Sequence, residues 1–256
     1  MLLAVDIGNT NVSYGLFSDE KIVFRAKVAT DKKMTAEQHA ITLSAVAELK
    51  NITLKEINGA IISSVVPELT SLVKEAIAIL TGVTAIVLGP GVKNGLPIRI
   101  DNPAQLGADL VAGAVGAIER FNTPCLVIDL GTATKISVID SAGVYKGCTI
   151  SAGVGISISA LSGSAALLPD INIELEKCSA FGTNTVSSMQ AGVILGTAAM
   201  LDGMCDRIEE SLHEKVESVV ATGGYASDII KYCKRKITCE HDLIFYGLKS
   251  IFEKNV

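Results

Sequence analysis

The sequence predicts an α/β protein made of two lobes that share one architecture. Its clearest feature is a strand, an Asp-x-Gly turn and a second strand, which occur once around Asp6 and again around Asp129. The two aspartates are 123 positions apart (129 minus 6), close to half of the 256 residues. In each half, three closely spaced β-rich runs come before helices that alternate with single strands. The repeat therefore predicts two half-sites that face a single ligand across a central cleft.

The first half is predicted to begin with an antiparallel meander, because its short β-rich runs follow one another at tight spacing. Residues 35–49 have helical periodicity, and Thr35 is suited to cap that helix. A strand stopped by Pro67, a helix and a further strand complete this half. The expected elements are strands 2–5, 12–17 and 22–28, helix 35–49, strand 59–66, helix 68–80 and strand 85–88.

The second half repeats this plan. Its expected elements are strands 126–129, 135–139 and 144–150, helices 155–167 and 185–210, strand 218–221 and closing helices. A helix over residues 104–120 is predicted to join the halves, since no Gly/Ser-rich spacer lies between them. The predicted lobes are therefore residues 1–118 and residues 119–256.

The composition argues against several classes of protein. The formal net charge of −5 disfavours a nucleic-acid partner, which would need clustered cations. Asp6 and Asn9 interrupt the first apolar run, so we expect no signal peptide, and no run reaches the ~18 apolar residues that span a membrane. The six cysteines form no Cys-x-x-Cys pair and the three histidines no ligand spacing. We therefore expect reduced thiols, a cytoplasmic location and no transition-metal site.

The first Asp-x-Gly turn has the residue types that a phosphate-binding loop needs. Asp6 could hold Mg²⁺ directly or through water, and Gly8 would let the backbone approach phosphate oxygens closely. Asn9, Thr10 and Asn11 add amide and hydroxyl groups that can bind those oxygens. An ordinary hairpin also uses Asn and Asp for its turn geometry, so one copy alone would signify little. Two copies in equivalent places favour the functional interpretation.

A third acid lies between the two repeats. Pro103 suits the start of a helix, which would place Asp109 on that helix near the predicted cleft. A carboxylate there could accept the proton of a hydroxyl group during phosphoryl transfer. Without the surrounding pattern, an exposed helical acid would be the simpler interpretation.

Small residues mark two further places where a ligand or another chain could come close. Thr222, Gly223 and Gly224 follow an apolar strand and could hold the adenosine or phosphate of a nucleotide against a helix N-terminus. Glycine pairs at such turns also occur for purely steric reasons, so both interpretations stay open. Gly192 and Gly196, at i, i+4 spacing, would allow close packing on a partner chain or within the monomer.

Together these motifs resemble those of the type III pantothenate kinases, a family of the acetate kinase, sugar kinase, Hsp70 and actin superfamily. The resemblance covers essentially the whole chain and rests on residues 6–10, 93–95, 101–103, 107–109, 129–134, 184–185, 188–189, 222–224, 243 and 247–248. It implies two ribonuclease H-like (actin-like ATPase) lobes with a central cleft. It also implies ATP-dependent phosphorylation of pantothenate to 4′-phosphopantothenate, the first step of coenzyme A biosynthesis, by a cytoplasmic homodimer.

The resemblance further implies cofactors and roles for single residues. Mg²⁺ would accompany ATP at Asp6, and a monovalent cation, K⁺ or NH₄⁺, would bind Asp129. Asp109 would be the general base toward the substrate hydroxyl. The nucleotide would be bound by Asp6, Gly8, Asn9, Thr10, Asn11, Thr132, Thr222, Gly223 and Gly224, and pantothenate by Ile100, Gly107, Ala108, Asp109, Leu110 and Thr185.

The chain departs from the family's usual residues around the acceptor. Leu110 stands where the family usually has Arg, and Ile100 where it usually has Tyr. Lys135 and Ser137 replace a usual Thr and Asp, and Lys135 or Arg99 could restore the lost positive charge. Two hypotheses therefore stand beside a pantothenate kinase. One is a non-catalytic nucleotide-binding relative or regulator, and the other is a kinase with a different acceptor alcohol.

Overall fold

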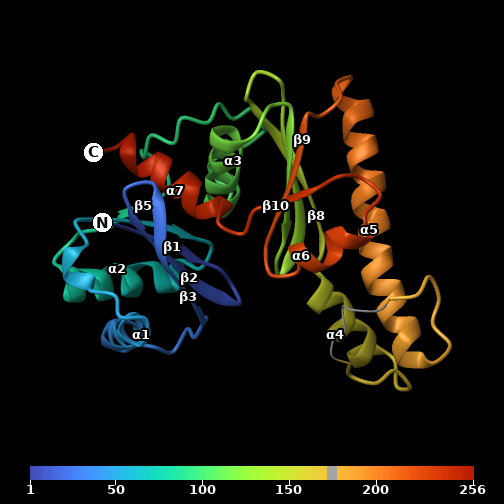
Figure 1. Ribbon diagram of the computed structural model, residues 1–256, viewed down its shortest axis with the longest axis horizontal. Coiled ribbons are helices and arrows are strands. Elements are labelled where there is room, and N and C mark those ends of the chain that lie inside the picture. The colour runs from blue at the N-terminus through green and yellow to red at the C-terminus, as the bar shows by residue number, and fades with distance from the viewer. Residues whose placement is uncertain (172–177) are drawn as a thin grey trace. The chain divides into compact units, whose positions relative to one another are not determined.

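The computed structural model of the protein describes residues 1–171 and 178–256 (Figure 1). The chain folds into two compact units. Unit 1 comprises Met1–Leu96, Asn102–Glu119 and Leu243–Val256, and unit 2 comprises Pro97–Asp101 and Arg120–Asp242. Among the described residues, no helix has both the length and the hydropathy needed to cross a bilayer.

Unit 1 is built on a five-stranded sheet of order β3-β2-β1-β4-β5. Its strands are β1 (Leu2–Ile7), β2 (Asn11–Ser18), β3 (Lys21–Ala29), β4 (Gly59–Ser64) and β5 (Ile86–Val87). β1, β2 and β3 form the predicted antiparallel meander, whereas β4 runs parallel to β1 and β5 parallel to β4. The central strand β1 is apolar on both faces because helices cover both sides of it, as in other sheets with parallel crossovers.

Two helices cover one face of this sheet. α1 (Ala36–Leu49) begins with a capping box made by Thr35 and Gln38, and α2 (Pro67–Thr81) has its proline in the first turn. Buried residues of α1 and α2 join the apolar side chains of β1, β2 and β4 in one core. This core fixes β1, and therefore the position of the turn that follows it.

The helices α3 (Ala108–Arg120) and α7 (Leu243–Glu253) belong to the rest of unit 1. Their backbones are in contact where they cross. A Cβ on Gly116 would collide with the carbonyl oxygen of Leu243, so the crossing requires glycine at this position. α7 also lies against β1 and β4. The last helix of the chain therefore completes the unit that the first strand begins.

Unit 2 repeats the plan of unit 1. Its strands are β6 (Cys125–Leu130), β7 (Ala133–Ile139), β8 (Tyr145–Ala152), β9 (Ser218–Thr222) and β10 (Thr238–Cys239). The sheet order β8-β7-β6-β9-β10 matches that of unit 1, with β6 in the place of β1. β6, β7 and β8 are antiparallel, and β9 and β10 continue the sheet in parallel. The predicted α/β class and duplicated architecture are confirmed.

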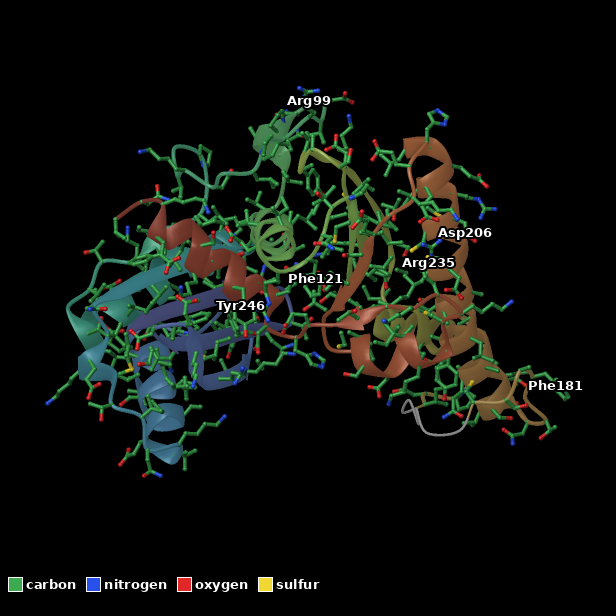
Figure 2. The ribbon with its side chains drawn as sticks, turned by 45° about the horizontal axis from the view of Figure 1, so that its top comes forward. Arg99, Phe121, Phe181, Asp206, Arg235 and Tyr246 are labelled. Carbon is green, nitrogen blue, oxygen red and sulfur yellow. The ribbon has the colours of Figure 1, made fainter. Side chains whose placement is uncertain are left out.

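The helices of unit 2 are α4 (Val154–Ser164), α5 (Thr185–Leu212) and the four-residue α6 (Ala226–Ile229). Their buried residues form a second core with β6, β7 and β9. Arg235 ties the segment after α6 to α5, since its guanidinium lies 2.6 Å from Asp206 and 2.7 Å from Glu209 (Figure 2).

Two predicted helices have different bounds in the structure. Residues 104–120 were expected to form one helix, but a 3-10 turn at Pro103–Gln105 is followed by extended Leu106, and α3 begins only at Ala108. The helix expected at 155–167 ends at Ser164, since Ala165 is extended. Serine and glycine in its last turn compete poorly for helical conformation.

The division of the chain also differs from the expected lobes. Residues 243–256 were assigned to the second lobe, residues 119–256, but they pack with unit 1. Local sequence patterns could not reveal this, because α7 is amphipathic and would cover either sheet equally well.

Candidate functional site

Unit 1 places Asp6 beside a short turn at the carboxyl end of β1. In the sheet register Asp6 lies opposite Ser13 on β2 and Ser63 on β4. The turn is closed by the Gly8 amide, which donates to the Asn11 carbonyl oxygen at 2.9 Å. Thr30, which directly follows β3, supports the turn by donating its hydroxyl hydrogen to the Gly8 carbonyl oxygen at 2.7 Å. The predicted nucleotide residues of unit 1 therefore lie together on one fixed hairpin.

The outer side of this hairpin is open. Asn9 and Thr10 are exposed, and a Cβ on Gly8 would meet only the Asn11 carbonyl oxygen within 4 Å among the described residues. Behind the hairpin, the Ser63 hydroxyl is fully buried and has no hydrogen-bond partner within the described chain. Carboxylate and hydroxyl oxygens are the ligand types that Mg²⁺ prefers, so the residues around Asp6 fit this ion.

Asp109 lies on a helix, as the sequence predicted, and because α3 begins only at Ala108 it stands in the first turn. Its Oδ1 accepts the Leu110 amide at 2.9 Å, and a Cβ on Gly107 would stand 2.5 Å from the same oxygen. A side chain at position 107 would therefore force the Asp109 carboxylate to move. Gly107, Ala108, Asp109 and Leu110 are all half-buried.

Unit 2 presents the equivalent hairpin with one conspicuous difference. Asp129 lies opposite Lys135 on β7 and Thr222 on β9. The Lys135 ammonium lies 2.9 Å from Asp129 Oδ2, and the two side chains are only 17% and 19% exposed. The sequence motifs include Asp129 but not Lys135, and the ion pair became evident only from the register of β6 and β7.

Glycines support the hairpin of unit 2 from two sides. A Cβ on Gly153 would collide with the carbonyl oxygens of Gly131 and Thr132, so α4 begins directly against the turn. Gly223 has a φ of 97°, and its Cβ would lie 2.6 Å from the Leu130 carbonyl oxygen. In the sequence both glycines are recognisable only as small residues. Their effect is to hold the exposed Thr132 in a fixed place.

The three residues of the predicted 222–224 turn have different environments. Thr222 is buried, and its hydroxyl lies 3.5 Å from the His241 carbonyl oxygen. Gly223 is required by its backbone conformation and by the contact with β6. Gly224 is exposed, and a Cβ there would meet nothing in the described chain within 4 Å. Because α6 has only four residues, it offers little helix dipole to a phosphate.

Thr185 lines a cavity of about 600 Å³ within unit 2. It is the first residue of α5, and Asn184 caps the helix by accepting the Ser187 amide at 2.9 Å. The cavity is wide open to solvent, and its wall combines apolar and polar side chains. The lining residues are Leu161, Leu168, Gly182, Thr183, Asn184, Thr185, Ser188 and Met189. A second cavity, of about 400 Å³, lies between α1 and α2 and includes no predicted site residue.

Ile100 belongs to a short segment that joins unit 2 beside β8. Ile98 bridges to Tyr145, and the Arg99 amide donates to the Tyr145 carbonyl oxygen at 2.9 Å. The Tyr145 hydroxyl is 3.2 Å from the Ser137 hydroxyl. Ile100 itself is half-buried. The structure thus groups Ile100, Asp129, Thr132, Thr185 and the 222–224 turn in unit 2, and Asp6, its turn and Asp109 in unit 1.

Comparison with solved structures defines the class of fold. A Campylobacter jejuni protein described as a conserved Baf family transcriptional activator matches with a TM-score of 0.62 at 20% identity, over 99% of this chain and 98% of that one. A ROK hexokinase from Thermus thermophilus matches with a TM-score of 0.53 at 11% identity, over 99% and 97%. The chain therefore has the two-lobed α/β fold found in sugar kinases and actin-like ATPases.

Sequence comparison identifies the family. The family model for type III pantothenate kinase matches residues 2–207. The type III pantothenate kinase of Shouchella clausii is 38% identical over 257 aligned residues, which cover all of both chains. This chain belongs to the type III pantothenate kinase family.

Proposed function

We propose that this protein transfers the γ-phosphoryl group of ATP to the primary hydroxyl of pantothenate, giving 4′-phosphopantothenate and ADP. Family membership over the full chain supports this activity. The observation that links this activity to particular residues is the position of Asp109 in the first turn of α3. The Leu110 amide binds its carboxylate, and Gly107 leaves space beside it.

In this proposal Asp109 is the general base. Its carboxylate accepts the hydroxyl proton of pantothenate while the hydroxyl oxygen attacks the γ-phosphorus. The bond from that phosphorus to the bridging oxygen breaks, and ADP leaves with the bonding electrons. The Leu110 amide binds Oδ1 and thereby helps to orient the carboxylate that accepts the proton.

The Asp6 hairpin is proposed to hold the phosphates of ATP. The exposed groups of Asn9 and Thr10, and the open backbone at Gly8, present donors of the kind that bind phosphate oxygens. Asp6, with the hydroxyls of Ser13 and Ser63 on the neighbouring strands, would hold Mg²⁺. That ion supplies neutralisation of the phosphate charge. Thr132 and Gly224 are assigned to the nucleotide from unit 2.

Pantothenate is assigned to Ile100, Thr185 and the Gly107–Leu110 segment. The cavity at the start of α5, with its mixed polar and apolar wall, supports the assignment of Thr185. Leu110 offers no charge to the carboxylate of the substrate, and the Lys135 ammonium is already paired with Asp129. Losing a charge-assisted hydrogen bond costs about 1.5–3 kcal/mol, so we expect pantothenate to bind about tenfold to a hundredfold more weakly than with Arg at position 110.

The protein is further proposed to be a cytoplasmic homodimer. Gly192 and Gly196 are exposed on α5, and a Cβ on either would meet no described residue within 4 Å. Within the described chain nothing therefore uses their small size, which favours a partner chain over packing inside the monomer. The six thiols without disulfide bonds suit a reducing compartment.

Replacement of Asp109 tests the proposed reaction. Coupled ADP release by the native protein should require pantothenate, and Asp109→Asn should lower kcat by a factor of about 10²–10⁴ because the base is lost. Calorimetry should still detect ATP binding by the variant.

Asp19→Asn is the matched control, because Asp19 is exposed and has a φ of 50°, which asparagine adopts readily. Its turnover should equal that of the native protein. Failure of the well-folded native protein to release ADP in response to pantothenate would refute the proposed activity.

A further inference from the structure

A row of four residues crosses the sheet of unit 2 at the end of β6. The register aligns Thr222 on β9, Asp129 on β6, Lys135 on β7 and Ile150 on β8. Paired residues on neighbouring strands project to the same face, so the Asp129 carboxylate and the Lys135 ammonium meet directly across the strands. Their separation of 2.9 Å is that of a charge-assisted hydrogen bond.

The internal repeat gives the natural comparison for this pair. In unit 1 the equivalent acid, Asp6, lies opposite Ser13 and Ser63. In unit 2 the place of Ser13 is taken by Lys135 and the place of Ser63 by Thr222. The aspartate of unit 1 therefore lies opposite two hydroxyl groups, whereas the aspartate of unit 2 lies opposite one hydroxyl group and one lysine ammonium group.

A monovalent cation therefore does not fit at Asp129 in the way the family resemblance implied. Oδ2 of that carboxylate is already bound by a positive charge, and both partners are mostly buried. A second cation on the same carboxylate would be repelled by the lysine at short range, where solvent screens little.

We propose that the Lys135 ammonium is a tethered substitute for the monovalent cation, so that this protein acts without K⁺ or NH₄⁺. An alkylammonium group has the charge and the N–H donors of an ammonium ion, and it needs no hydration shell to be removed at each binding event. Its stem is fixed in a β-strand, which places the charge at Asp129 permanently. Lys135 is a positioning residue, since it acts through Asp129 and the neighbouring turn.

This inference rests on the proposed kinase function for its turnover measurement, but ATP binding tests it separately. The native protein should bind ATP with the same affinity in K⁺, NH₄⁺ or tetramethylammonium salts at equal ionic strength, as measured by calorimetry. Its pantothenate-dependent turnover should be equally indifferent to the cation.

Lys135→Thr restores the residue that the family usually has and vacates the carboxylate. In tetramethylammonium this variant should lose about tenfold or more in ATP affinity and turnover, because one charge-assisted hydrogen bond is removed. Adding K⁺ or NH₄⁺ should recover both. A structural role alone would give a loss that no cation repairs.

Lys146→Thr is the matched control. Lys146 lies on the adjacent strand β8 and is 4.0 Å from Asp140, with a more exposed side chain. Its removal should leave both measurements independent of the cation. Thermal unfolding of each variant verifies that it is folded.

Two results would overturn the proposal. One is a rise of about tenfold in the ATP affinity of the native protein on adding K⁺ or NH₄⁺. That rise would show that a monovalent cation still binds and promotes ATP binding although Lys135 is paired with Asp129. The other is folded Lys135→Thr protein that ignores the cation. Native protein without turnover in every salt would refute the kinase activity instead, and calorimetry would still decide the role of Lys135.

Discussion

His39 is a titratable side chain in the core of unit 1. It is 1% exposed on α1, and neither ring nitrogen has a hydrogen-bond partner within the described chain. Burial lowers the pKa of His39 because it penalises the charged imidazolium, while the negative charge of Asp31 opposes this shift only in part. The folded protein therefore holds this imidazole neutral under conditions in which the unfolded chain begins to protonate it.

The stability of the protein should accordingly depend on pH. The unfolded histidine titrates near 6.5, and the folded pKa lies below it, so the unfolded state binds more protons as the pH falls through 6.5. The free energy of unfolding should decline below that pH, by at most about 1.4 kcal/mol per pH unit from this residue, until the folded pKa is reached. Urea unfolding at several pH values measures the slope. His39→Phe should flatten it, and an unchanged slope would contradict the assignment.

For single residues, the sequence predicted the strand or helix on which each lies better than the side chain with which each interacts. Asp6 and Asp129 lie near the ends of their strands and Asp109 lies on a helix, as the motifs predicted, because the type of element follows from local pattern. The Lys135–Asp129 ion pair needed the register of two strands, and a register shift of one residue would have separated them. From the sequence alone, Lys135 was a candidate to bind the pantothenate carboxylate. In the structure its ammonium group forms an ion pair with Asp129 instead.

Among the elements, strands were predicted more closely than helix boundaries. The meanders consist of short β-rich runs that turn residues separate at tight spacing, and this pattern can be recognised locally. The start of α3 was missed because a 3-10 turn at Pro103–Gln105 and extended Leu106 come before Ala108, although Pro103 is also typical of an α-helix start. The two-residue strand β10 was missed because it pairs with β9 over only two positions and carries no periodicity.

The turn after β9 offers a test at this scale. Gly223→Ala should destabilise the protein by more than about 1–2 kcal/mol, because alanine is strained at a φ of 97° and its Cβ would press on Leu130. Gly224→Ala is the control, since the space around it is open and its φ is not in the left-handed region.

Thermal unfolding of the two alanine variants compares their stabilities, and calorimetry measures their affinity for ATP. Gly224→Ala should unfold like the native protein and bind ATP more weakly if the nucleotide lies against this turn. Equal loss of stability in both variants would contradict the conclusion that only position 223 requires glycine.

At the scale of the whole molecule, the repeat was visible in the sequence but the grouping of the chain was not. Two Asp-x-Gly hairpins at half the chain length predicted two similar sheets, and both have the same strand order. The packing of α7 on β4 joins residues at least 179 positions apart (243 minus 64), and its packing on β1 joins residues at least 236 apart (243 minus 7). No local pattern encodes such contacts.

The proposed homodimer can be tested on α5. Gly196→Glu should shift the protein toward monomer in light scattering coupled to size exclusion, because a charged side chain would enter a close helix contact. Ser211→Glu is the control, since it adds the same charge at an exposed position near the other end of the same helix. If the Gly196→Glu protein keeps the native molar mass, then Gly192 and Gly196 do not contact a partner chain.

The position of α7 affects how the protein is made. The ribosome releases the five strands of unit 1 first, yet Phe245 and Phe252, which pack where Gly15 and Gly59 leave room, emerge only after all of unit 2. Until then one face of the first sheet lacks its covering helix in the nascent chain. A premature stop codon near position 242 would therefore damage the earliest part of the polypeptide, and the later part should suffer less.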